Sequence, residues 1–212
     1  MITLMAAAII TIVALGDSTT AGTPAFKSPI EAPPSGAGNV ESQYAHWLMQ
    51  THPDWRVLNR GVNGERSEQV RARFDRDVLT AKPDLVVIIA GVNDVYQGRP
   101  AEAAERELDA MYNAARAAKI PVIAGSIIPF NVATPDQNAR MHAINAWIRD
   151  DAAHHPDVVF CDTRTAVAAP GAPDRLVSSP DNLHPSPDGY KLMSDALEPV
   201  IRTVLARARP LR

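Results

Sequence analysis

Cysteine and aromatic residues are scarce in this 212-residue chain. Cysteine occurs once, at Cys161, so no internal disulfide can form. Cys161 follows the apolar run 158–160, and we expect it to be buried and unreactive. Aromatic residues make up 5% of the chain, and this shortage disfavours an extended platform of rings for binding sugars.

The chain also has little excess of charge of either sign. The formal net charge is −3, and no long run of Lys and Arg occurs. A surface for nucleic acid or for an anionic membrane needs a concentration of positive charge, so neither is expected as a partner. No feature of the sequence indicates a particular oligomeric state.

Long hydrophobic runs are missing as well, since a membrane span takes about 20 apolar residues. The first fifteen residues are apolar but lack the positively charged start of a signal peptide, and they lead directly into Gly16-Asp17-Ser18. We therefore expect them to be structure, including a core strand, rather than a cleaved signal. On this ground a cytoplasmic location is favoured over secretion.

The chain does contain a regular alternation of strand-like and helix-like segments. Strands are predicted over residues 9–15, 56–62, 85–90, 121–128 and 158–161. Helices are predicted over residues 40–50, 67–80, 101–119, 136–153 and 187–208, the last with Ser186 as N-cap, after an irregular segment at 170–187. This alternation predicts an α/β fold in one domain over residues 1–212, with a five-stranded, mostly parallel sheet covered by helices on both faces.

The first strand leads into a candidate for chemistry. Its uninterrupted apolar run is typical of a strand buried on both faces of a parallel sheet. Gly16 is expected to end the strand and to allow a sharp turn, so that Ser18 lies exposed at the carboxyl end, where open α/β sheets bind ligands. From this stretch alone, Ser18 is either a nucleophile or only a cap of the following segment.

Residues 22–38 are rich in Pro, Gly and Ser and show little helical or strand pattern. Loops of this length are uncommon in compact domains and are usually functional or mobile. Because the segment follows Ser18, we predict that it forms a wall of a substrate pocket. A surface insertion without a role is the alternative.

Small or amide residues follow the next two predicted strands. Asn63-Gly64 comes after the second strand, and Asn93-Asp94 after the third. The carboxyl ends of parallel strands meet at one edge of the sheet, so these residues are expected near Ser18. Gly and Asn are common in turns, so each pair alone is weak support, but together with a serine they indicate a site.

A fourth polar segment, residues 181–184, precedes the final helix. Three prolines within residues 180–187 restrict its backbone. His184 follows Asp181 by three residues and is placed to act as a general base oriented by that carboxylate, by the logic of a Ser-His-Asp triad. The other histidines show no metal-ligand spacing such as HExxH, and cysteine pairs are lacking, so no metal site is expected.

Together these segments resemble the four sequence blocks of the SGNH hydrolase superfamily, the GDSL-type esterases and lipases. Thr19 stands where the family name has Leu, beside the candidate nucleophile, and this departure puts little in doubt. Gly61 is a rival for the glycine of the second block, but Gly64 aligns better. In the family's order, the blocks are Gly16-Asp17-Ser18, Gly64, Gly91-Val92-Asn93-Asp94 and Asp181-Asn182-Leu183-His184.

The resemblance implies a flavodoxin-like three-layer α/β/α fold and hydrolysis of esters or thioesters, with no metal and no cofactor. It implies Ser18 as the nucleophile, His184 as the base and Asp181 as the residue that orients the base. The oxyanion hole would be formed by the backbone N–H groups of Ser18 and Gly64 and by the side-chain amide of Asn93.

The expected substrate is a small-molecule ester. A short-chain carboxylesterase or arylesterase is the first interpretation, with lysophospholipase or thioesterase activity also open, and a carbohydrate O-deacetylase is the alternative. A flavodoxin-like binding domain without catalysis is disfavoured because no triad member is missing. Nucleotide binding and the α/β-hydrolase fold are disfavoured because the chain lacks GxGxxG and a Walker lysine after the first strand, and lacks the GxSxG elbow.

Overall fold

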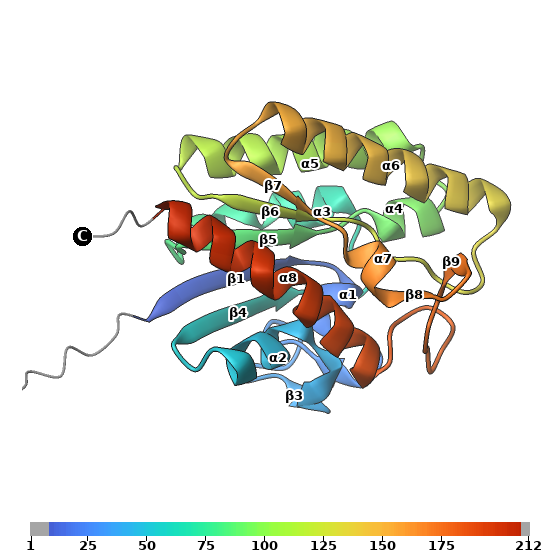
Figure 1. Ribbon diagram of the computed structural model, residues 1–212, viewed down its shortest axis with the longest axis horizontal. Helices are drawn as coiled ribbons and strands as arrows, with labels where there is room; N and C mark the ends of the chain where they lie inside the picture. Colours follow the sequence, from blue (N-terminus) through green and yellow to red (C-terminus); the bar gives the residue numbers. More distant parts are fainter. Residues whose placement is uncertain (1–8, 209–212) are drawn as a thin grey trace, which may run out of the picture.

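A five-stranded parallel sheet forms the centre of the computed structural model, which describes residues 9–208 (Figure 1). The strands lie side by side in the order β4-β1-β5-β6-β7, and every neighbouring pair is parallel. Their bounds are β1 Ile10–Gly16, β4 Trp55–Gly61, β5 Leu85–Ile89, β6 Val122–Gly125 and β7 Val158–Cys161. The predicted five-stranded parallel sheet and flavodoxin-like fold are confirmed.

Helices cover both faces of the sheet and make the outer two layers (Figure 1). One face carries α2 Tyr44–Thr51 and α8 Pro187–Ala208, and the other carries α3 Ser67–Ala72, η2 Asp75–Leu79, α5 Ala101–Ala117 and α6 Pro135–His154. The short elements are α1 Ser18–Ala21, β2 Phe26–Lys27, β3 Ala37–Gly38, η1 Val40–Ser42, α4 Val92–Tyr96, α7 Thr163–Val167, β8 Ala168–Ala169 and β9 Ala172–Leu176.

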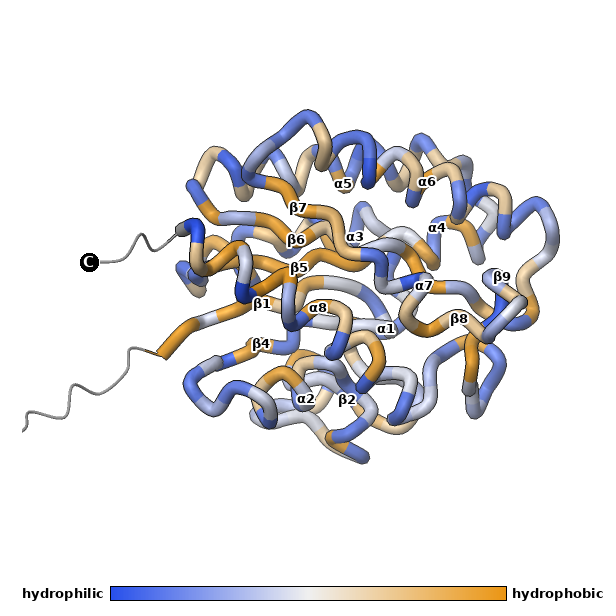
Figure 2. Tube along the Cα trace, in the orientation of Figure 1, coloured by the Kyte–Doolittle hydropathy of each residue, from blue (hydrophilic) through white to orange (hydrophobic). Residues whose placement is uncertain are grey.

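The continuous apolar strands follow from burial on two sides. In β1, Val13 and Leu15 pack into the core below α5 and α6, whereas Ile12 and Ala14 pack into the core below α2 and α8. Side chains of a strand alternate between faces, so a strand with helices on both sides needs apolar residues at every position. Figure 2 shows this as central strands coloured mainly hydrophobic, beside helices along which hydrophobic and hydrophilic residues alternate.

The strand order creates a switch point at the middle of the sheet. The chain leaves β1 toward β4 on one side, and the later strands β5, β6 and β7 extend the sheet on the other. In open α/β sheets the crevice beyond the carboxyl ends of the strands at such a point is where ligands bind. The residues that follow β1, β4 and β5 are therefore brought together by topology.

The predicted helix over residues 67–80 is interrupted. The α-helix α3 ends at Ala72, and the π-helical turn η2 follows it. Between them, Arg73 is buried, and its guanidinium donates hydrogen bonds to the carbonyl oxygens of Gly16 and Arg60 at 2.7 Å each. The apolar stripe of the prediction is retained, because Phe74 and Val78 are buried.

Two segments that were expected to be irregular contain hairpins. Strands β2 and β3 pair within residues 22–38, and β8 and β9 pair within residues 168–176. The expectation of an irregular segment from residue 170 onward is thus wrong for β9. Strands of two to five residues between turns carry too few alternating positions to be recognised from sequence.

The two ends of the chain match their predictions where they are described. Helix α8 begins at Pro187 as expected, and the Ser186 hydroxyl accepts a hydrogen bond from the Gly189 N–H at 3.3 Å, as an N-cap does. Strand β1 accounts for the core strand expected in the first fifteen residues. The part of that expectation that concerns residues 1–8 lies outside the described residues.

Candidate active site

Ser18 is the first residue of the short helix α1, separated from the end of β1 by Asp17 alone. The expectation that it lies exposed is wrong, because the residue is buried. A side-chain oxygen of Asp17 caps this turn by accepting a hydrogen bond from the Thr19 N–H at 3.0 Å. We expected the turn after β1 to require glycine at position 16. Gly16 does not adopt a positive φ, so the turn itself does not require it. It is required by space, because a Cβ there would collide with the Ile89 carbonyl oxygen at the end of β5.

His184 reaches Ser18 across 166 positions of sequence. Its Nε2 lies 2.9 Å from the Ser18 Oγ, and its Nδ1 lies 2.7 Å from an Asp181 carboxylate oxygen. A carboxylate only accepts, so Nδ1 carries the proton, and Nε2 is left to accept the hydroxyl proton of Ser18. The predicted nucleophile, base and orienting acid therefore form one hydrogen-bonded row.

The Asp181 carboxylate is held in its ionised form. Burial raises its pKa, but hydrogen bonds from the His184 ring, from the His184 N–H and from the Leu183 N–H outweigh this and bring the pKa below its ordinary value. The two backbone bonds measure 2.8 and 2.9 Å and end on the oxygen that the His184 ring does not use. The carboxylate is thus fixed in orientation as well as in charge.

Gly64, in the turn after β4, and Asn93, in the short helix α4 after β5, line the same cavity as Ser18. Gly64 has φ +78, and nothing lies within 4 Å of the position of an added Cβ, so its conformation rather than crowding calls for glycine. The Asn93 side-chain amide donates to the Glu65 carbonyl oxygen at 2.9 Å, which uses one of its two protons. Gly61, the rival position, is packed against α1.

The sequence profile of the GDSL-like lipase/acylhydrolase family matches residues 14–192. The chain belongs to that family. The resemblance to SGNH hydrolases seen in the sequence is confirmed, and the family is one of ester hydrolases.

The chain is similar to an esterase and to two solved proteins of the same family. An acetylxylan esterase of Geobacillus stearothermophilus is 27% identical over 164 residues, which cover 70% of this chain and 74% of that protein. A solved G-D-S-L family lipolytic protein from Desulfitobacterium hafniense is 28% identical, with a TM-score of 0.73 and coverage of 90% and 98% of the two chains. A GDSL-like lipase from Bacteroides thetaiotaomicron is 25% identical, with a TM-score of 0.69 and coverage of 91% and 88%.

A cavity of about 270 Å³ opens beside Ser18 and His184, and Gly64 and Asn93 also line it. The rest of its wall is mostly apolar, and the Tyr96 and Phe130 rings meet edge to face there with centroids 5.6 Å apart. The remaining lining residues are Thr19, Asn63, Val92, Gln97, Ile128, Leu183. An apolar wall next to a hydroxyl and polar donors suits an acyl group whose carbonyl is turned toward the donors.

The prediction that residues 22–38 form a wall of this cavity is wrong, because none of them lines it. The segment is held instead against the end of β4, where the Ser28 hydroxyl donates to the Gly61 carbonyl oxygen at 2.6 Å. The wall comes from segments farther along the chain, which the sequence reasoning did not select. Phe130, an aromatic residue just beyond a predicted strand, was the available signal.

Asp94 is a second residue to which the sequence reasoning gave no specific role. It is buried, and its carboxylate accepts hydrogen bonds from the Ser67 N–H at 2.8 Å and from the Ser67 hydroxyl at 2.9 Å. The start of α3 is thereby tied to the turn that carries Asn93. Its place in the block Gly91-Val92-Asn93-Asp94 was the signal for it.

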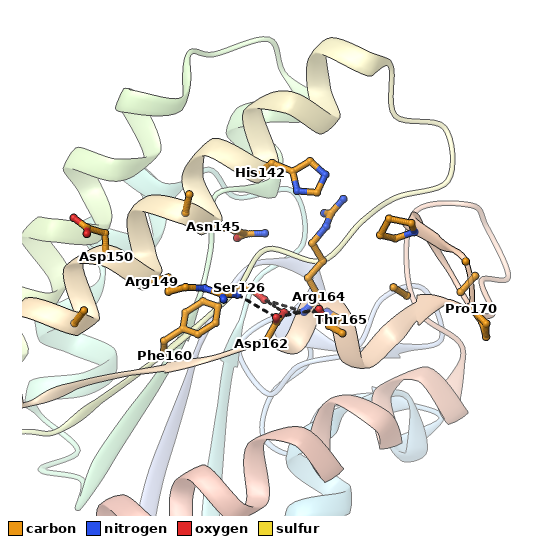
Figure 3. Close-up of a pocket in the computed structure, with 16 residues that line it drawn as sticks. Ser126, His142, Asn145, Arg149, Asp150, Phe160, Asp162, Arg164, Thr165 and Pro170 are labelled. Carbon is orange, nitrogen blue, oxygen red and sulfur yellow. Dashed lines mark hydrogen bonds and ion pairs between the residues drawn. The ribbon is translucent and has the colours of Figure 1, made fainter.

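A larger groove of about 780 Å³ lies between α6, the end of β7, α7 and the β8–β9 hairpin (Figure 3). Arg149 extends over the Phe160 ring at 4.6 Å, and buried Arg164 pairs with Asp174 of β9 at 2.6 Å. The groove shares no lining residue with the cavity at Ser18. Size alone therefore does not identify the reactive site.

Within residues 9–208, no group of three or more His, Cys, Asp or Glu side chains is arranged to hold a metal ion. In the same part of the chain, no helix combines the length and apolar character needed to cross a membrane. Cys161 is buried as expected, and burial raises the pKa of its thiol to about 12, which keeps it protonated.

Proposed function

We propose that this protein cleaves carboxylic esters with short acyl chains through an acyl-enzyme on Ser18. The observation that carries the proposal is the hydrogen-bonded row Ser18–His184–Asp181, with contacts of 2.9 and 2.7 Å, at the mouth of an apolar cavity. Neither the row nor the cavity alone would indicate the reaction, but together they supply an activated oxygen and a place for the acyl group.

In the proposed reaction, the Ser18 Oγ attacks the ester carbonyl carbon while His184 Nε2 takes the hydroxyl proton. The negative charge that develops on the carbonyl oxygen is stabilised by the Ser18 N–H, the Gly64 N–H and the Asn93 amide. Breaking the ester bond transfers the proton from His184 to the leaving alcohol. A water molecule then repeats the sequence on the acyl-enzyme and releases the acid and free Ser18.

The size of the cavity favours a short substrate. A volume of about 270 Å³ lies below the range of about 300–1,000 Å³ that is usual for pockets binding drug-sized ligands. The apolar wall favours an aliphatic or aromatic group over a sugar ring at that position. We therefore place short-chain carboxylesters and aryl esters first, with lysophospholipids and thioesters as further substrates to test.

Acetyl groups on carbohydrate form the second candidate class of substrate. The observation in its favour is the 27% identity to the acetylxylan esterase of Geobacillus stearothermophilus. An acetyl group fits the same cavity, and the sugar would lie outside it. A panel of p-nitrophenyl esters from acetyl to octanoyl, run beside acetate release from acetylated xylan, separates the two classes by kcat/KM.

The experiment that tests the mechanism compares Ser18→Ala with Ser35→Ala. Ser35 is an exposed serine in the segment 22–38 and serves as the matched control. We expect Ser18→Ala to lose hydrolysis of p-nitrophenyl acetate and labelling by a fluorophosphonate, while Ser35→Ala keeps both. Hydrolysis at the wild-type rate by Ser18→Ala would show that the proposed mechanism is wrong.

A further inference from the structure

The segment 22–38 is hydrogen-bonded to the end of β4 and the loop that follows it through one short turn. The Ser28 side chain is fully buried, and its hydroxyl bonds the Gly61 carbonyl oxygen at 2.6 Å. Three residues later, the Glu31 carboxylate accepts two backbone N–H groups, that of Asn63 at 2.9 Å and that of Ser28 at 2.9 Å. A single carboxylate therefore joins the segment 22–38 to the residue that precedes Gly64.

On its other side, the loop at Gly64 is held by the Asn93 amide, which donates to the Glu65 carbonyl oxygen at 2.9 Å. Gly64 is exposed, its φ is +78, and open space surrounds the position of an added Cβ. The Gln97 side chain reaches its carbonyl oxygen only at 3.4 Å. The bond from the Asn63 N–H to the Glu31 side chain, at 2.9 Å, is shorter and ends on a carboxylate oxygen.

We propose that Glu31 is a positioning residue for the oxyanion hole. The Glu31 carboxylate accepts the Asn63 N–H and so fixes the backbone conformation at Asn63. This conformation orients the following peptide, between Asn63 and Gly64, so that the Gly64 N–H points toward the reacting carbonyl oxygen. The proposal rests on the function proposed above. The segment 22–38 would then act as a brace, by which we mean that Glu31 in this segment supports the loop at Asn63 and Gly64, and it would not form a wall of the pocket.

The brace is itself anchored to the body of the protein. Phe26 in β2 is buried, and the Tyr190 hydroxyl of α8 donates to the Thr23 carbonyl oxygen at 2.8 Å. Glu31 also lies in a backbone turn, since its own N–H bonds the Ser28 carbonyl oxygen at 3.0 Å. The carboxylate is thus presented by a fixed backbone, as precise positioning of a reacting group requires.

The test compares Glu31→Ala and Glu31→Gln with the control Glu41→Ala. Glu41 is an exposed glutamate in the neighbouring η1 turn, so its removal makes the same change in charge outside the brace. Rates of p-nitrophenyl acetate hydrolysis are expressed per serine labelled by fluorophosphonate, so that misfolded molecules are not counted. Inhibition by an alkylboronic acid is measured in parallel, because its tetrahedral adduct places an oxygen in the oxyanion hole.

For Glu31→Ala we expect kcat to fall about tenfold with KM within about twofold, since a misdirected donor weakens the transition state and not substrate binding. The inhibition constant of the boronic acid should rise by the same factor as kcat/KM falls. Glu31→Gln keeps one acceptor without the charge, so we expect a loss of about threefold. Glu41→Ala should match the wild type.

The outcomes separate the two proposals. A purely structural role for Glu31 would lower the melting temperature and the labelled fraction but leave kcat per labelled serine unchanged, and that result would overturn the brace. If Glu31→Ala fails to fold, a wild-type kcat in Glu31→Gln overturns it equally. Failure of the proposed function would appear differently, as wild-type protein that is not labelled at Ser18 or as Ser18→Ala that remains active.

Discussion

Asp17, the residue before the nucleophile, makes the stability of this protein depend on pH in a predictable way. Its side chain is buried, and one carboxylate oxygen has no hydrogen-bond partner among the described residues. Burial raises the pKa from 3.8 to about 7; hydrogen bonds from Thr19 oppose the rise, and nearby Asp94 adds to it. The folded protein therefore holds a proton on Asp17 at pH values where the unfolded chain has released it.

The direction in which folding stability changes with pH follows from proton linkage. Below about pH 4 the group is protonated in both states and has no effect on the balance between them. Between pH 4 and 7 the unfolded chain ionises while the folded one does not, so folding loses stability as the pH rises. A pKa difference of this size corresponds to about 4 kcal/mol, at about 1.4 kcal/mol per tenfold change in proton affinity.

Asp17→Asn removes the ionisation and keeps an oxygen for the Thr19 N–H. We expect the free energy of unfolding of the variant, relative to wild type, to rise by about 4 kcal/mol between pH 4 and pH 8. Urea unfolding followed by far-UV circular dichroism across this range measures the difference. The change with pH is the readout, because the new amide nitrogen is buried without an acceptor and lowers the stability at every pH.

The control for this experiment is a carboxylate outside the core. Asp109→Asn removes a carboxylate that is exposed on α5 and should not reproduce the slope. If the difference between Asp17→Asn and wild type is constant from pH 4 to pH 8, the buried carboxyl does not retain its proton and the reasoning is refuted.

Three further predictions concern the site. Asn93→Ala should fold and bind substrate but lose about 10²- to 10³-fold in kcat, roughly 3 kcal/mol, measured on p-nitrophenyl esters; an unchanged kcat would remove Asn93 from the oxyanion hole. Asp181→Asn should keep its backbone hydrogen bonds but present the wrong partner to His184, lowering kcat about 10⁴-fold at neutral pH; a loss of less than tenfold would contradict the role of the carboxylate. Gly16→Ala should lower the melting temperature or prevent folding, because its Cβ collides with the Ile89 carbonyl oxygen, and a stable, active variant would show that the strand ends can separate.

Much of the fold was predictable because its signals are local. Strands covered on both faces need apolar residues at successive positions, and β5 carries them throughout, while β1 carries them from Ile12 to Leu15. The long helices α5 and α6 present apolar residues at helical spacing. The break in residues 67–80 was not predicted, and it coincides with Arg73, whose side chain bonds carbonyl groups of β1 and β4 that are distant in sequence.

The candidate site divides in the same way. The Asp181–His184 pair lies within one proline-stiffened loop, and Ser18, Gly64 and Asn93 each follow a strand of the parallel sheet, so their meeting at one edge follows from topology. The acyl wall was not predictable. Phe130 and Tyr96 face each other only because the loop after β6 and the turn after β5 converge there.

By itself, the sequence determined the parallel sheet, the edge at which chemistry collects and the residues proposed to carry it, because strand period and turn residues act over short distances. Tertiary structure alone decided how those residues are held. The role of Gly16 comes from contact with β5, the charge state of Asp17 comes from burial, and the brace from Glu31 to Asn63 spans 32 positions. Contacts and solvent exclusion of this kind arise between distant segments, and no local pattern records them.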